Sequence, residues 1–216
     1  MKKNILKIVL LIIVVVVIAF LINTFRKFFI IQGLQENLET YLASTNYHIR
    51  ITTLENNVTS FTTNIYLKED NSLVTFENDN SKTSIYNDGN TTDIFTENSD
   101  GRKAELNKNT TISYSIPNYL KTENSWRTFC AGMFSSIKSV DVDGKDCYVI
   151  EGNLGSIFIN APSPSNAQEI YIEKDTGLCI QLINSDNTQI FEYEFDNVSD
   201  ETFVKPNIEQ YELIEE

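Results

Sequence analysis

The sequence has few of the residues on which most catalytic and metal sites depend. It holds one histidine, three cysteines and one tryptophan among 216 residues. A single histidine excludes His-rich metal sites and most catalysis that relies on an imidazole. No phosphate-binding loop, Ser/His/Asp set or C-x-x-C pair is present. We therefore expect no catalytic residues, no metal ligands, no cofactor and no enzymatic activity.

Positive charge is also scarce. The chain has 17 Lys and Arg residues against 30 Asp and Glu residues, and five of the basic residues lie before Phe28, ahead of every acidic residue. The rest of the chain therefore has 12 basic and 30 acidic residues, a formal charge of about −18. Nucleic-acid binding draws on an excess of positive charge, so we expect no nucleic-acid partner.

A long apolar run lies close to the N-terminus. Ile8–Ile22 contains no polar residue, and Ile5 and Leu6 extend it past a single Lys7. The resulting stretch of about 18 residues is close to the length of helix that crosses about 30 Å of hydrocarbon. No small-x-small cleavage pattern follows it, and no cysteine lies near it that could form a lipoprotein-type junction. We therefore predict that residues 1–31 form an uncleaved signal-anchor transmembrane helix.

The basic residues around this run predict its orientation. Lys2 and Lys3 precede the run together with Lys7, which favours a cytoplasmic N-terminus. Arg26–Phe29 follows it and has the cations and aromatic rings typical of a membrane interface. We expect a single-pass protein of the cell membrane whose residues 32–216 form one extracytoplasmic domain.

The three cysteines leave their chemistry open. Cys130, Cys147 and Cys179 all lie in the second half of the chain. They are either small buried apolar side chains or include one disulfide, which an extracytoplasmic compartment permits. The pairs that we favour for such a disulfide are Cys147–Cys179 and Cys130–Cys147.

The rest of the chain is mostly typical of β-strands. Gln32–Ser44 has the apolar spacing of an amphipathic helix, but after Asn46 the period changes to two and turn-forming residues separate the runs. Asp88–Gly89 and Asp175–Gly177 have the sequences of hairpin turns. No strand-helix-strand rhythm is present, so the chain is expected to be α+β with an antiparallel sheet.

One stretch in the second half has helical spacing instead. Pro117–Lys138 is predicted to be a helix that covers one face of the sheet, with Trp126 as a core anchor. A further strand is expected at Gly155–Asn160, before a proline-containing loop.

Three segments carry a family resemblance: Ser84–Phe95, Glu169–Leu178, and Phe191–Val198 with the following Phe203 and Pro206. They resemble the LolA/LppX/RseB-like lipoprotein-carrier superfamily, the outer-membrane lipoprotein-sorting proteins and their relatives, in a membrane-anchored Gram-positive form. Ser84–Phe95 and Glu169–Leu178 are similar to its strand–turn–strand units. Phe191–Val198, followed by Phe203 and Pro206, is similar to its C-terminal motif. The resemblance implies an N-terminal helix followed by a curved antiparallel sheet, an incomplete β-barrel, with helices covering its concave face.

The resemblance also implies a function without catalysis. The concave face is expected to hold a lipid, an acyl chain or a lipidated peptide, unless the helices fill it completely. The alternative is a surface-docked regulatory or interaction module that binds an extracytoplasmic protein partner, as in envelope or sporulation and germination regulators. The candidate cavity residues are Ile49, Ile51, Ile65, Leu67, Val74, Phe76, Trp126, Met133, Phe191, Tyr193 and Phe195.

Two acidic patterns suggest further chemistry. Asp141–Asp146 spaces carboxylates as a calcium loop does, but position 12 of such a loop is Gly152, so we interpret it as an acidic turn. Glu192 and Glu194 lie on one face of a predicted strand and resemble a glycosidase pair. We interpret them as part of a solvent-exposed face, because two carboxylates on the same face of a strand are usually exposed to solvent.

Overall fold

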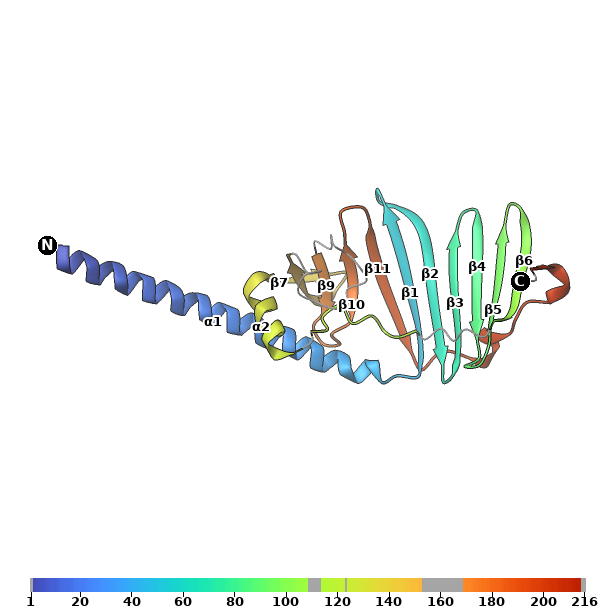
Figure 1. The fold of residues 1–216 in the computed structure, drawn as a ribbon, viewed down its shortest axis with the longest axis horizontal. Helices are drawn as coiled ribbons and strands as arrows, with labels where there is room; N and C mark the ends of the chain where they lie inside the picture. Colours follow the sequence, from blue (N-terminus) through green and yellow to red (C-terminus); the bar gives the residue numbers. More distant parts are fainter. Residues whose placement is uncertain (1, 109–113, 123, 153–168, 215–216) are drawn as a thin grey trace. The chain divides into compact units, whose positions relative to one another are not determined.

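The computed structural model describes residues 2–108, 114–122, 124–152 and 169–214 (Figure 1). The chain divides into two compact units. The first unit comprises Met1–Leu38 and Asn118–Leu178, and the second comprises Glu39–Pro117 and Cys179–Glu216. The predicted strand at Gly155–Asn160 lies outside the described residues.

The N-terminal helix α1 is continuous over Lys2–Leu42. It passes through Gly33 without a break, so the predicted anchor and the predicted amphipathic helix are one element. Its apolar stretch is exposed, and among the described residues α1 is the one helix long and apolar enough to cross a membrane. Farther along, Ile31, Leu34 and Leu38 are buried at helical spacing, which marks the face that packs on the protein.

The second unit is built on an open sheet. Its strands follow the order β12-β6-β5-β4-β3-β2-β1-β11-β10, and all neighbours in this order are antiparallel except β12 and β6. The order does not return from β10 to β12, so this set of strands is not closed into a barrel. The strands are β1 (Asn46–Glu55), β2 (Val58–Lys68), β3 (Asn71–Asn78), β4 (Ser81–Asn87), β5 (Thr92–Asn98), β6 (Gly101–Lys108), β10 (Cys179–Ile183), β11 (Thr188–Phe195) and β12 (Glu212–Leu213).

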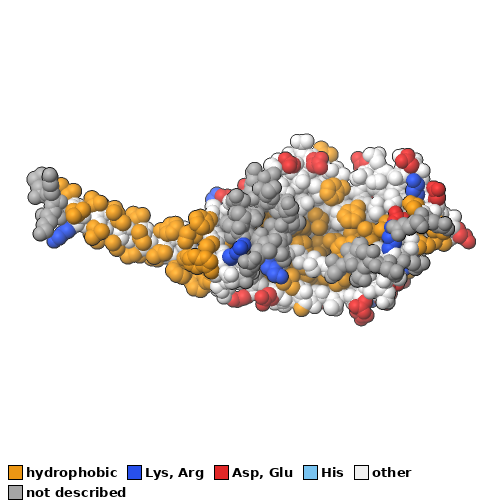
Figure 2. Space-filling view, in the orientation of Figure 1, with side chains coloured by type: hydrophobic (Ala, Val, Ile, Leu, Met, Phe, Trp, Pro, Cys, Tyr) orange, Lys and Arg blue, Asp and Glu red, His pale blue; other side chains and the backbone are white. Residues whose placement is uncertain are grey.

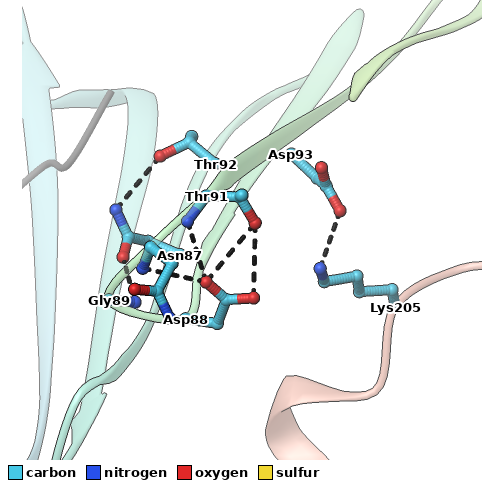
Figure 3. Close-up of polar contacts among 8 residues, drawn as sticks. Asn87, Asp88, Gly89, Thr91, Thr92, Asp93 and Lys205 are labelled. Carbon is cyan, nitrogen blue, oxygen red and sulfur yellow. Dashed lines mark hydrogen bonds and ion pairs between the residues drawn. The ribbon is translucent and has the colours of Figure 1, made fainter. Parts of the chain in front are cut away.

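The turn between β4 and β5 shows how side chains fix these hairpins (Figure 3). Gly89 has a φ of +85°, as the predicted Asp-Gly turn requires. The Asp88 carboxylate accepts hydrogen bonds from the backbone N–H of Thr91 at 2.9 Å and of Asn90 at 3.0 Å. The Asn87 side-chain oxygen accepts one from the Gly89 N–H at 2.7 Å. These hydrogen bonds, above all the one from the Thr91 N–H, stabilise the charged form of Asp88. They therefore hold the pKa of its carboxyl below the ordinary range.

The first unit combines part of α1 with a second helix and three strands. Helix α2 (Ser125–Phe134) precedes β7 (Ser136–Val142), β8 (Lys145–Glu151) and β9 (Glu169–Glu173), which pair antiparallel in the order β9-β8-β7. The predicted helix Pro117–Lys138 is therefore too long. It begins only after Asn124, whose side-chain oxygen accepts from the backbone N–H of Arg127 at 3.0 Å.

The chain is thus α+β, with a long apolar N-terminal helix, an open and mostly antiparallel sheet, and one further α-helix among the described residues. The predicted fold class is confirmed. The period-two pattern accounts for the sheet, since side chains alternate between its two faces along each strand.

Candidate functional site

One face of the sheet in the second unit carries most of the candidate cavity residues. The strand register places Ile49 opposite both Tyr193 of β11 and Ile65 of β2, and Ile65 opposite Val74 of β3. Paired residues point to the same side, so β11, β1, β2 and β3 share one apolar surface. We call it the apolar face; it comprises Ile49, Ile51, Ile65, Leu67, Val74, Phe76, Phe191, Tyr193 and Phe195.

Burial across the apolar face is uneven. Ile49 and Val74 are fully buried, while Ile51 and Leu67 are half-buried and Phe76 is 42% exposed. Figure 2 shows hydrophobic side chains gathered over the strands of this unit, with acidic side chains towards its margins. The apolar face therefore has a buried centre and an incompletely covered periphery.

The β11 side of the apolar face is a ladder of aromatic rings. Phe191, Tyr193 and Phe195 follow one another at centroid distances of 6.4 Å, with their planes 14° and 3° apart. The ring of Tyr41 meets Phe195 at 4.9 Å. The Tyr193 hydroxyl donates to the carbonyl of Cys179 at 2.9 Å. The ladder presents flat apolar rings and keeps the Tyr193 hydroxyl satisfied.

A segment that follows β6 contacts the same face. The Tyr47 hydroxyl donates to the carbonyl oxygen of Tyr114 at 3.2 Å, and Ile116 is buried. Tyr47 lies on the same side of the sheet as the apolar face, because it pairs with Leu67 and Phe195. Burial raises the pKa of Tyr47 to about 12, because the phenolate is disfavoured away from water.

The other two candidate cavity residues belong to the first unit. Trp126 and Met133 lie on α2, which packs on α1 there. The prediction that Trp126 is a core anchor is wrong: its side chain is 68% exposed and stacks on Phe129 at 5.6 Å. The reason is that α2 meets α1 through other residues: a Cβ atom at Gly132 would lie 2.9 Å from the Phe28 nitrogen, and the ring of Phe129 contacts that of Phe25.

The cysteines are all free thiols, so neither disulfide that the spacing left open is formed. The thiol of Cys147 donates to the carbonyl of Lys145 at 3.4 Å, and that of Cys179 to the carbonyl of Gln181 at 3.5 Å. Burial raises the pKa of both thiols. Cys147 and Cys179 are thus buried, unreactive side chains, while Cys130 is half-buried.

The opposite face of the sheet carries the predicted solvated carboxylates. Glu192 lies 3.6 Å from the guanidinium of Arg50, and Glu194 lies 3.8 Å from the ring of His48. Both glutamates are largely exposed, and each has its own cationic or imidazole neighbour across the strand pair. This arrangement fits the interpretation of a solvated face rather than of a glycosidase pair.

Carboxylates of the acidic turn between β7 and β8 also form contacts within the protein. Asp141 accepts from the backbone N–H of Gly144 at 3.1 Å, and Asp146 lies 3.2 Å from the ammonium of Lys174. No group of three or more His, Cys, Asp or Glu side chains that could hold a metal occurs among the described residues. The interpretation as an acidic turn accounts for these carboxylates.

Sequence patterns missed a second apolar cluster on the solvated face. Leu73, Tyr86, Phe95 and Ala104 are buried together, and the C-terminal residues Phe203 and Tyr211 pack on them. Lys205, from the same C-terminal stretch, forms an ion pair of 2.7 Å with Asp93 (Figure 3). Leu73, Tyr86 and Phe95 alternate with residues of the opposite face along their strands, and this alternation could have indicated the cluster. The burial of the cluster, however, depends on the position of the C-terminal stretch, which no local pattern predicts.

Beside this cluster the solvated face is hollowed into a cavity of about 540 Å³. Its lining includes the rings of Tyr66 and Tyr86 and charges of both signs from Arg50, Lys82 and Glu97. Arg50 lies near Glu192, and Lys82 lies near Glu77. The positive and negative charges at this cavity therefore largely offset each other.

No protein-family model matches the sequence. No curated protein matches it either. Similar folds occur among solved structures. A conserved protein from Thermus thermophilus is 10% identical, with a TM-score of 0.47 over 85% of this chain and 97% of that one.

Two mycobacterial proteins also have similar structures. LprF from Mycobacterium bovis is 10% identical, with a TM-score of 0.42 over 79% of this chain and 94% of its own. LppX from Mycobacterium tuberculosis is 10% identical, with a TM-score of 0.34 over 79% of this chain and 97% of its own. The lipoprotein LppX is thus among the solved structures to which this chain is similar.

Proposed function

We propose that this protein is a single-pass, membrane-anchored binding protein that holds a lipid or acyl chain on its apolar face outside the cytoplasm. The observation that carries the proposal is the apolar face itself. Nine apolar side chains from four adjacent strands share it, and its periphery at Ile51, Leu67 and Phe76 is left half-buried or exposed. Exposed apolar side chains at this periphery are costly in water and favour contact with an apolar ligand.

The chemistry of the face favours a hydrocarbon ligand. The Phe191–Phe195 ladder offers stacked rings, and the hydroxyls of Tyr47 and Tyr193 already donate to backbone carbonyls. A ligand that required many hydrogen bonds would find few free partners there, whereas an acyl chain requires only apolar contact.

The apolar stretch of α1 supports the membrane attachment. It is exposed along its length, which in water would cost about 25 cal/mol for each Å² of apolar surface. A bilayer removes that cost. With the N-terminus in the cytoplasm, as the basic residues of the N-terminal tail favour, the chain after the apolar stretch of α1 lies outside the cytoplasm.

The test uses the full chain in membranes and a photoactivatable diazirine analogue of palmitic acid. After irradiation, labelled peptides are identified by mass spectrometry. We expect labelling of β1, β2, β3 and β11 in addition to α1, and competition by excess unlabelled palmitate at the strands but not at α1. Labelling confined to α1 would overturn the binding proposal.

A matched pair of variants tests the site. Phe76 is 42% exposed on the apolar face, and Ile190 is 38% exposed on the opposite face, both within strands. We expect Phe76→Asp to lower strand labelling several-fold and Ile190→Asp to leave it unchanged. Equal labelling of the two variants would contradict the assignment of the site to the apolar face.

A further inference from the structure

Helix α2 is fixed to α1 by close backbone contact. A Cβ atom at Gly132 would lie 2.9 Å from the Phe28 nitrogen and 3.0 Å from the Thr24 carbonyl oxygen, so only glycine permits this approach. The ammonium of Lys27 donates to the carbonyl of Ser135, directly after α2, at 2.6 Å. These contacts leave α2 little freedom to move along α1.

The contacts set the depth of α2 relative to the apolar stretch of α1. The ring of Phe129 on α2 lies 5.3 Å from that of Phe25 and 6.4 Å from that of Phe28. These two residues follow Ile22, where the apolar run ends, by three and six positions. At 1.5 Å per residue they lie about 4.5 and 9 Å beyond it. The interfacial layer of a bilayer is about 5–8 Å thick on each side, so α2 lies at its level.

The exposed side chains at this level are those of an interface. Trp126 is 68% exposed, Phe134 is 69% exposed, and Phe29 of α1 is 63% exposed. Helix α2 contains no acidic residue, and its one charged residue, Arg127, is exposed, as is Arg26 of α1. Large aromatic rings beside cations are typical of the headgroup region and costly in open water.

We propose that α2 is a membrane-docking helix, which lies in the headgroup layer of the bilayer that α1 spans and contacts lipid through Trp126 and Phe134. The partner is the lipid surface. The inference rests on the proposed anchoring by α1, because α1 sets the depth. Its consequence is that the first unit is attached to the membrane at two places and cannot tilt freely about α1.

Trp126 is the only tryptophan in the chain, so its fluorescence reports directly on its surroundings. The full chain is reconstituted into vesicles of phosphatidylcholine and phosphatidylglycerol. We expect blue-shifted emission that is strongly quenched by lipids with a spin label near the headgroup and weakly quenched by aqueous iodide. Emission typical of water, quenched by iodide and insensitive to the lipid label, would overturn the inference.

Two controls separate this inference from the anchoring proposal. Flotation of the vesicles shows whether the chain is inserted; a chain that fails to float contradicts both proposals, and an inserted chain with a water-exposed Trp126 contradicts this one alone. The double variant W126F/V204W moves the reporter to an exposed position in the second unit, where Val204 is 71% exposed. We expect its emission to be quenched by iodide and not by the lipid label.

Discussion

At the scale of single residues, the tightest constraint is Gly177, in the turn after β9. Its φ is +71°, and a Cβ atom there would lie 2.2 Å from the Leu34 carbonyl oxygen and 2.8 Å from the Leu38 nitrogen of α1. Both atoms belong to backbone that is hydrogen-bonded in a helix and cannot easily move. The turn and the helix therefore lie in contact because residue 177 has no side chain.

We expect Gly177→Ala to lower the free energy of unfolding by about 3 kcal/mol or more, since left-handed strain and overpacking each cost about 1–3 kcal/mol. The control is Gly144→Ala, where φ is +81° and nothing lies within 4 Å of the added Cβ. It should lose only the smaller contribution of backbone strain. Urea unfolding of the full chain in detergent measures both. Equal losses for the two variants would show that the helix contact is unimportant.

At the scale of elements, the Asp88 side chain gives the β4–β5 hairpin a stabilisation that varies with pH. Donors from the backbone of Thr91 and Asn90 lower its pKa, so the stabilisation that Asp88 provides is present above the ordinary aspartate pKa of about 4 and is lost as pH falls through its lowered value. We expect NMR titration of the Asp88 carboxyl to give a pKa below that ordinary value. Asp88→Asn should retain the turn at neutral pH and remove its contribution to the acid dependence. An ordinary pKa would contradict this account.

Elements were predictable where the local pattern decides the structure. Alternating residues predicted β1 to β5 because the sheet has an apolar face, and Asp88–Gly89 predicted its turn because the backbone there requires a positive φ.

Other features depend on more than the local pattern. The predicted start of α2 at Pro117 is wrong, although Asn124 is a good N-cap, because apolar spacing alone does not mark a helix boundary. The exposure of Trp126 could not be predicted, since it depends on which side of α2 meets α1. The pairing of β12 with β6 has no sequence pattern that would reveal it.

At the scale of the whole molecule, the apolar stretch of α1 should attach the chain to membranes without contributing to the fold of the two units. A lysine near the centre of a spanning helix costs about 2.5–3.5 kcal/mol of insertion free energy. We therefore expect Val14→Lys combined with Ile18→Lys to release the chain from membranes under alkaline carbonate extraction.

The double leucine variant at the same two positions, V14L/I18L, should remain in the membrane pellet. Both pairs of substitutions lie in a stretch that is not buried in the structure, so circular dichroism should show the same strand content for each. Retention of the double lysine variant in the pellet would contradict the assignment of this stretch as the anchor.

The short parallel strand at the C-terminal end has a consequence for how copies of the protein behave beside one another. Leu213 pairs with Ala104, and the N–H of Ile214 donates to the Ala104 carbonyl at 3.0 Å, so part of the outer edge of β6 is already hydrogen-bonded by its own chain. An uncovered edge would be a template for strands of neighbouring molecules, which are concentrated when held on a two-dimensional surface. The pairing of β12 with β6 therefore opposes polymerisation through the β6 edge, which crowding of molecules on a surface would otherwise promote.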